Sequence, residues 1–394
     1  MICRACAGSD TVRVLDLGQT PAADHFPPEW SAIDTCESAH PLAMELCRRC
    51  GLAQLAEDDT TPEEPQGVEP LALRTQAADA VRTVAMSGFL DGDTVLEFGS
   101  PHGGSWLGLL AARGFCPPPP GRPASVVLDC FGLMHEACQR SALRERVNAT
   151  ASDGVLLLQF HSLAAIVTHR QWNALRHGHY AYYSLTALQR MLTDVGMRVS
   201  HAWEFDLYGG TVLIAARHGV RSDTSHTVRT ILATEHALGV CEPRTLRTLQ
   251  QAADGHAGAL HTWLATMADR GQRVYAYGAA SRAVALFSRA GVDRRLVEAV
   301  ADASCAKQGR RMPGTDLRII SPAELVSADP DFVLLTLPDL YAEVRRELPE
   351  LDGRWVVDMP QEYSMLTGAE ESRRQPGVFS ACAKPTVAQP RSTL

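Results

Sequence analysis

Paired cysteines are the first residues in this sequence whose spacing points to chemistry. Two C-x-x-C pairs lie near the N-terminus, Cys3 with Cys6 in MICRAC and Cys47 with Cys50 in LCRRCG. Together they can form the four-sulfur tetrahedral shell that zinc prefers, at about 2.3 Å per ligand. Four ordinary buried cysteines are the alternative, but the paired spacing favours the metal. Four thiolates leave no open coordination position, so we expect a structural zinc ion.

Two glycine-rich turns each follow a short apolar strand and precede a helix. The first is in DTVLEFGSPHGGSWLGLLAARG and contains Glu97, Gly99, Gly103 and Gly104, and the second is in QRVYAYGAASRAVALFSRAG and contains Gly278. A strand, turn and helix of this kind open nucleotide-binding α/β domains, because N–H groups at the helix start favour anionic or polar ligands. A purely structural turn is the alternative. The second turn lacks the full three-glycine fingerprint of a nicotinamide site.

Composition limits the classes of protein that this chain can belong to. The length of 394 residues predicts two to four domains. The chain is 45% hydrophobic and 21% charged, with a formal net charge of −8, as expected for soluble domains. An acidic balance argues against nucleic acid or an anionic membrane as the main partner. The sequence has no run of about 20 apolar residues. Eleven cysteines, an odd number, indicate reduced thiols and a cytoplasmic location.

Hydrophobic patterning divides the chain into five expected parts. They are a zinc-binding unit (1–58), an α/β domain (71–222), a helical connector (223–270), a Rossmann-like domain (271–362) and a tail (363–394). An acidic, proline-rich linker at 57–70 separates the first two parts.

Short apolar runs predict the strands of both sheets. In the zinc-binding unit the expected strand is TVRVLDLG. In the first α/β domain the expected strands are DTVLEF, SVVLDCF, GVLLLQFHS and the antiparallel pair MRVSHAWEF and GGTVLIAARH. In the second they lie in QRVYAY, LVEAVADAS, ELVSADPDFVLLTLP and GRWVVDMP. We therefore expect an α/β fold with two Rossmann-like sheets.

The order of these parts resembles the sugar-nucleotide C-methyltransferases of deoxysugar biosynthesis. The motifs that carry the resemblance are CRAC, VLDLGQTPAADHF, LCRRCGLAQL, RHGHYAYYSLTAL, YGGT, YAYGAASRA and KQGRRMPGT. Members of that family typically methylate C3 of a TDP-4-keto-hexose with S-adenosylmethionine. The resemblance implies a zinc-binding domain, a class I methyltransferase-like domain and a C-terminal Rossmann-like domain. It also implies a nucleotide-linked sugar as substrate and a role in antibiotic or other natural-product biosynthesis.

The resemblance also implies a catalytic group. The family motif, approximately Y-H-E-H-x-x-Y, removes the proton next to the substrate ketone. His179 matches its second histidine and is our choice of base, because an imidazole accepts protons near neutral pH. Arg176 and Gly178 replace the family's tyrosine and glutamate, and an arginine there could hold an enolate or a carboxylate. A structural role is the alternative for the histidines. The expected catalytic residues are His179, His135, His177, Arg176 and Tyr182.

The same resemblance predicts substrate contacts from the middle and C-terminal domains. Lysine and arginine suit phosphate oxygens, so residues of KQGRRMPGT are expected to contact a diphosphate or to close over the sugar. An ordinary surface loop is the alternative. The expected substrate-binding residues are Tyr208, Gly209, Gly210, Gly278, Lys307, Gln308, Arg311 and Gly314.

The middle domain is short where the family holds the adenosine of its cofactor. There an acidic residue that ends the second strand binds the ribose. Here only CPPPPGRPAS separates the helix that ends at Gly114 from the strand SVVLDCF, whereas a strand, helix and strand need about 30 residues or more. We therefore expect a truncated methyltransferase-like domain, which puts the binding of S-adenosylmethionine in doubt.

Three hypotheses about function follow. The preferred one is an enzyme independent of S-adenosylmethionine, in which His179 removes a proton α to a carbonyl and epimerisation, isomerisation or elimination follows. The second is a C-methyltransferase that binds the cofactor in a reduced pocket. The third is a non-catalytic protein that binds a sugar nucleotide or another enzyme.

Overall fold

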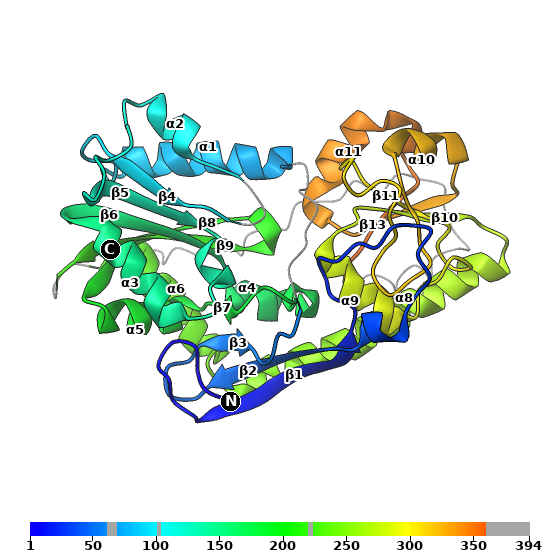
Figure 1. Cartoon of the computed structure of the whole chain (residues 1–394), viewed down its shortest axis with the longest axis horizontal. Helices are drawn as coiled ribbons and strands as arrows, with labels where there is room; N and C mark the ends of the chain where they lie inside the picture. The colour runs from blue at the N-terminus through cyan, green and yellow to red at the C-terminus, as the bar shows by residue number, and fades with distance from the viewer. Residues whose placement is uncertain (61–68, 101–103, 220–223, 360–394) are drawn as a thin grey trace, which may run out of the picture.

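The computed structural model describes the chain except for residues 61–68, 101–103, 220–223 and 360–394. A methyltransferase-like sheet with helices on both faces forms one lobe of the molecule, and a second α/β sheet forms the other (Figure 1). The N-terminal strands and one long helix run along the side of the molecule and join the two lobes. The predicted α/β fold class is confirmed, with an N-terminal unit, a methyltransferase-like domain and a C-terminal Rossmann-like domain.

The N-terminal unit is built on an antiparallel sheet with the order β1-β2-β3-β7. Its strands are β1 (Thr11–Thr20), β2 (His40–Cys47), β3 (Ala53–Leu55) and β7 (Ala181–Tyr182). The strand predicted from TVRVLDLG is β1. Strand β7 comes from the middle of the sequence and pairs with β3, so the N-terminal unit holds the segment that contains the expected catalytic motif.

The middle sheet has the order β4-β5-β6-β9-β8. Its strands are β4 (Val95–Phe98), β5 (Ala124–Cys130), β6 (Thr150–His161), β8 (Met197–Phe205) and β9 (Thr211–His218). Helices α1 (Leu71–Met86) and α2 (Leu107–Ala111) cover one face, and α3 (Gln139–Ala149), α5 (Leu185–Asp194) and α6 (His226–Leu238) cover the other (Figure 1). Strands β4, β5 and β6 are parallel, whereas β9 is antiparallel to both of its neighbours.

Strand β4 is an edge strand within the described part of the chain, because the segment after it leads through α2 directly to β5, its neighbour in the sheet. In a complete doubly wound sheet, further strands would lie beyond this edge and form one side of the nucleotide site. The predicted truncation of the middle domain is therefore confirmed.

Three described helices connect the two lobes, in the region where we expected a helical connector. They are α6, the single turn α7 (Pro243–Leu246) and the long α8 (Thr248–Asp269). The end of α6 is set by Gly239 in the left-handed conformation, after which Pro243 begins α7.

The C-terminal sheet is wholly parallel, with the order β12-β11-β10-β13-β14. Its strands are β10 (Val274–Tyr277), β11 (Val300–Ala301), β12 (Ile319–Ile320), β13 (Phe332–Leu335) and β14 (Trp355–Val357). The helices are α9 (Ser281–Ala290), α10 (Pro322–Ala328) and α11 (Tyr341–Glu347). The strand order reverses between β10 and β13, which places a binding crevice at their carboxyl ends.

The segment ELVSADPDFVLLTLP contains one strand and not a continuous extended run. Its first half lies in α10, and only its second half forms β13. The reason is local: Ser321 and Glu324 form a capping box, and Pro322 occupies the first helical turn.

Arg311 joins the N-terminal unit to the C-terminal domain. Its Nη1 and Nη2 donate to the two carboxylate oxygens of Glu37 at 2.6 and 2.7 Å, and the N–H of Gly314 donates to the same carboxylate at 2.6 Å. The side chains of Arg311 and Glu37 are only 4% and 10% exposed. We predicted Arg311 and Gly314 as substrate contacts, but the structure uses them to join two parts of the fold, because Glu37 already satisfies the guanidinium.

Substitution Glu37→Gln should destabilise the protein by about 3 kcal/mol, because it leaves the Arg311 cation buried without its counter-charge. Burial alone would raise the pKa of Glu37, but hydrogen bonds from Arg311 and Gly314 lower it below its ordinary value of 4.5. This contribution to stability is therefore present above pH 4.5 and is lost as the pH falls through the lowered folded-state value. Urea denaturation at several pH values measures both effects.

The control is Asp352→Asn, which removes an exposed ion pair to Arg345 and should leave the free energy of unfolding nearly unchanged. Equal effects of the two substitutions would contradict the assigned role of Glu37.

Candidate functional site

The four predicted metal ligands lie together at the end of the N-terminal sheet. The Sγ atoms of Cys3, Cys6, Cys47 and Cys50 all lie within 4.8 Å of one another. Cys3 Sγ lies 3.5 Å from Cys50 Sγ, and Cys6 Sγ lies 3.6 Å from Cys47 Sγ. A tetrahedral zinc site with bonds of about 2.3 Å separates its sulfurs by roughly 3.8 Å. The cluster therefore fits a structural zinc ion, which would hold the two chain turns together.

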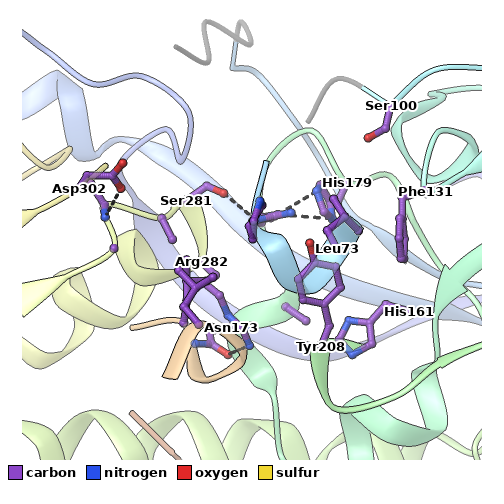
Figure 2. Close-up of a pocket in the computed structure, with 18 of the residues that line it drawn as sticks. Leu73, Ser100, Phe131, His161, Asn173, His179, Tyr208, Ser281, Arg282 and Asp302 are labelled. Atoms are coloured by element: carbon purple, nitrogen blue, oxygen red, sulfur yellow. Dashed lines mark hydrogen bonds between the residues drawn. The ribbon is translucent and has the colours of Figure 1, made fainter. Parts of the chain in front are cut away.

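A cavity of about 270 Å³ lies between the middle and C-terminal domains. It lies where β5, β6 and β10 reach their carboxyl ends, which is the usual place for a ligand in α/β sheets. Figure 2 shows how side chains from both domains converge on it. Polar residues that line it include Ser100, His161, Asn173, Arg176, His179, Tyr182, Tyr208, Ser281, Arg282, Asp302 and Lys307.

Arg176 and His179 form the centre of this site. Nε of Arg176 donates to Nε2 of His179 at 2.8 Å, and Nη1 of Arg176 donates to the Ser281 hydroxyl at 2.6 Å (Figure 2). The hydroxyl of Tyr182 accepts the backbone N–H of Arg176 at 3.1 Å. His179 is 5% exposed. The loop of the middle domain thus contacts the start of α9 in the C-terminal domain through one guanidinium.

His135 packs against His179. Their rings are 4.5 Å apart between centroids and nearly perpendicular, at 82°. Nδ1 of His135 lies 3.0 Å from the carbonyl oxygen of Gly178, and because a carbonyl only accepts, this nitrogen carries the proton. The two histidines that the sequence predicted as catalytic are therefore in contact.

A buried ion pair positions the segment that carries His135. Asp129, at the end region of β5, accepts the backbone N–H groups of Gly132 and Leu133 at 2.8 and 2.9 Å, and Nε of Arg146 donates to its other oxygen at 2.8 Å. Burial raises the pKa of Asp129, and the charge of Arg146 opposes that shift. These contacts form the turn that leads into the short helix Leu133–His135.

His177 points away from the cavity. It is 2% exposed, and its Nε2 lies 3.2 Å from the carbonyl oxygen of Pro41 in the N-terminal unit. Burial lowers its pKa. The next residue, Gly178, donates its N–H to Asp58 at 2.8 Å. The structure therefore places His177, which we expected in the catalytic group, on the side that attaches the motif to the N-terminal unit.

The glycine turn after β4 provides only part of a cofactor site. The carboxylate of Glu97 accepts the Ser105 hydroxyl at 2.5 Å and the Trp106 N–H at 2.8 Å, so it stabilises the start of α2. Gly99 precedes Ser100, which lines the cavity, and Gly104 has a positive φ of 82°. Gly103 lies outside the described residues.

S-adenosylmethionine fits this turn in part. Ser100 lines the cavity, and its hydroxyl suits the amino-acid end of the cofactor. Beyond the edge strand β4, no described strand provides the acidic residue that would bind the ribose of S-adenosylmethionine.

The glycines between β8 and β9 serve close packing. A Cβ at Gly209 would lie 2.5 Å from Gln171 Nε2, and one at Gly210 would lie 2.5 Å from the Ala165 Cβ. The neighbouring Tyr208 does line the cavity, and its N–H donates to Asp339 at 3.0 Å.

In the C-terminal domain, Gly278 and Lys307 line the cavity, whereas Gln308 supports the loop behind it. Nζ of Lys307 donates to the carbonyl oxygen of Ala279 at 2.9 Å, and the ammonium group lies 4.8 Å from the centre of the Phe26 ring. Gln308 Nε2 donates to the Asp302 carbonyl oxygen at 3.0 Å.

Arg282 and Asp302 line the cavity but were not among the predicted site residues. Asp302 directly follows β11, the second strand of the C-terminal unit, and its carboxylate accepts the N–H groups of Ala279 and Ser304 at 2.7 and 2.8 Å. An acid after the second strand of a Rossmann-like unit is a recognisable sequence signal. Arg282 has no such signal, because its importance depends on how the two domains meet.

Two family models match this chain in the order found in the fold. Residues 3–64 match a putative zinc-binding domain, and residues 206–360 match a C-methyltransferase C-terminal domain. A curated relative, the C-methyltransferase NovU of Streptomyces niveus, is 26% identical over 91% of this chain and 95% of its own length. The chain is therefore similar to C-methyltransferases in both matched domains and over most of its length.

Solved structures that are similar to this chain cover smaller parts of it. Mitomycin 7-O-methyltransferase MmcR is 18% identical, with a TM-score of 0.27, over 36% of this chain and 46% of its own. Magnesium protoporphyrin IX methyltransferase of Synechocystis PCC 6803, solved with bound SAH, is 15% identical, with a TM-score of 0.27, over 39% of this chain and 90% of its own. Among the helices described, none has the length and apolar character to span a membrane.

The comparisons do not support our doubt about S-adenosylmethionine, because the curated relative is itself named a C-methyltransferase. They support the predicted zinc-binding domain and a methyltransferase-like enzyme.

The purified protein should contain one zinc ion per chain. Cys47→Ser should remove the metal and lower the free energy of unfolding by about 3–5 kcal/mol, because a structural zinc ion ties together turns that are otherwise separate. Elemental analysis and urea denaturation measure the two effects. Cys36→Ser, at an exposed cysteine outside the cluster, is the control and should keep both metal and stability. Full stability of the metal-free Cys47 variant would contradict a structural zinc site.

Proposed function

We propose that this protein removes a proton from the carbon next to a carbonyl in a nucleotide-linked sugar, with His179 as the base. The observation that carries the proposal is the contact between His179 and Arg176 inside a cavity formed by two α/β domains. A base beside a cation is the arrangement that enolate formation needs, because negative charge develops on the carbonyl oxygen as the proton leaves.

Each residue of the cluster has a distinct role in this step. The imidazole of His179 takes the proton from carbon, and the electron pair of that C–H bond moves onto the carbonyl oxygen. Arg176 stabilises the resulting enolate, and Ser281 orients the guanidinium through its hydroxyl at 2.6 Å. His135 packs against the ring of His179 and limits its orientation.

The C-terminal domain supports a nucleotide as the other part of the substrate. The turn from Gly278 to Ser281 brings the N-terminus of α9 to the cavity, where free N–H groups favour phosphate oxygens. Asp302 lies at the place where a ribose hydroxyl is bound in Rossmann-like domains, and its carboxylate has lone pairs beyond the two backbone bonds that it accepts.

Two fates of the enolate have separate support. The name of the curated relative favours methylation at carbon, with S-adenosylmethionine supplying the methyl group when bound. The missing strands beyond β4 favour the second candidate, in which a proton returns and the product is an epimer, an isomer or an eliminated sugar.

The protein should exchange the α-proton of a 4-keto sugar nucleotide for deuterium in D₂O, as followed by NMR. His179→Asn should slow this exchange about 10²–10⁴-fold, because the base is lost. His177→Asn is a matched control from the same motif and should keep the exchange, because His177 faces the N-terminal unit. Undiminished exchange in the His179 variant would refute the assignment, and no exchange in the wild-type protein would favour a non-catalytic role.

Calorimetry with S-adenosylhomocysteine, together with mass analysis of the product formed with S-adenosylmethionine, decides between the two fates. Cofactor binding and a product heavier by one methylene group establish methyl transfer. If the missing strands beyond β4 prevent cofactor binding, proton exchange proceeds without cofactor binding and without a methylated product.

A further inference from the structure

Arg282 presents a guanidinium to the cavity whose hydrogen-bonding capacity is largely unused. It lies in the first turn of α9, and its Nη2 donates to the side-chain oxygen of Asn173 at a long 3.4 Å. Its Nε–H is buried and has no hydrogen-bond acceptor in the described part of the chain. No ion pair to Arg282 occurs among the described residues. Figure 2 shows Arg282 and Asn173 side by side at the cavity wall.

The positive charges of Arg282 and Arg176 act on the same region. Burial lowers the pKa of Arg282, Asp339 opposes this shift, and Arg176 adds to it. Burial lowers the pKa of His161 to about 3, and both arginines contribute in the same direction. Asp339 accepts the N–H of Tyr208 and makes no ion pair with Arg282 among the described residues. Arg176, Arg282 and Lys307 line the cavity together with Asp302, Glu343 and Glu347, and the two arginines both act on the region around His161.

We propose that a carboxylate of the substrate binds between Arg176 and Arg282, so that the substrate is a nucleotide-linked sugar acid. The guanidinium fork suits the two oxygens of a carboxylate, and a buried cation without an ion-pair partner is stabilised by an anion. This proposal rests on the proposed function, of which it names the substrate class.

The position of Arg176 favours a carboxylate over the diphosphate as the anion. Arg176 contacts His179 directly, so an anion that it binds lies next to the reacting carbon. The diphosphate is expected instead at the turn that follows β10, where the N-terminus of α9 is available.

Carboxylate binding would also release the base. In the structure, the Nε–H of Arg176 occupies Nε2 of His179. A carboxylate is a stronger acceptor for a guanidinium than a neutral imidazole, because the hydrogen bond is then charge-assisted on both sides. When Arg176 turns to the carboxylate, the lone pair of His179 becomes available for the proton of the substrate.

Calorimetric titration of the zinc-loaded full chain with UDP-glucuronate and UDP-glucose tests this site, because the two compounds differ by one carboxylate. We expect UDP-glucuronate to bind about 10-fold more tightly or better. Arg282→Met should bring the two affinities to within about 2- to 3-fold, and Arg282→Lys should keep part of the difference. The control is Arg295→Met, at a side chain that is 89% exposed, and it should change neither affinity.

The outcomes separate this proposal from the proposed function. Equal, measurable affinities of the wild-type protein for UDP-glucuronate and UDP-glucose overturn the carboxylate site. An equal loss of affinity for both compounds in Arg282→Met also overturns it, because the arginine would then bind the diphosphate. UDP, TDP, glucuronate and glucose are titrated in parallel. If neither nucleotide and no UDP-sugar binds but glucuronate binds better than glucose, the nucleotide part of the proposed function fails and the carboxylate site stands. If neither free glucuronate nor UDP-glucuronate binds more tightly than its glucose counterpart, the carboxylate site fails.

Discussion

The guanidinium of Arg176 connects the parts of this protein that must meet for chemistry to occur. It donates to His179 from its own loop and to Ser281 of the C-terminal domain, at 2.8 and 2.6 Å. The loop itself is held by Asp58 and by the pairing of β7 with β3, so the N-terminal unit takes part in its placement. A zinc ion in the cysteine cluster would thus stabilise the site from a distance, by keeping that unit folded.

Residue spacing and short apolar runs were sufficient to predict the cysteine cluster and most of the strands. The two C-x-x-C pairs predicted the cysteine cluster, and alternating or apolar runs predicted most strands of the three sheets. The ten-residue gap before SVVLDCF predicted the missing strands, because chain length is a physical limit on topology. His135 and His179 were placed by resemblance and meet in the structure, but their catalytic roles remain predictions.

Contacts between distant segments could not be predicted in the same way. Arg311 in a glycine-containing loop has the sequence features of a phosphate ligand, yet its partner is Glu37, 274 residues away. The position of Arg282 in the cavity depends on the packing of α9 against Asn173 of the middle domain, 109 residues away. A charged residue in a loop has several possible partners, and only the tertiary fold selects one of them.

A double-mutant cycle on proton exchange tests most directly whether Arg176 couples the two domains at the base. The exchange rates of Arg176→Met, Ser281→Ala and the double variant are compared with that of the wild-type protein. The structure predicts a coupling of about 1–2 kcal/mol, so that the Ser281 substitution has little further effect once Arg176 is replaced. Additive effects, within about 0.3–0.5 kcal/mol, would show that the contact does not serve the reaction and would contradict a shared interdomain site.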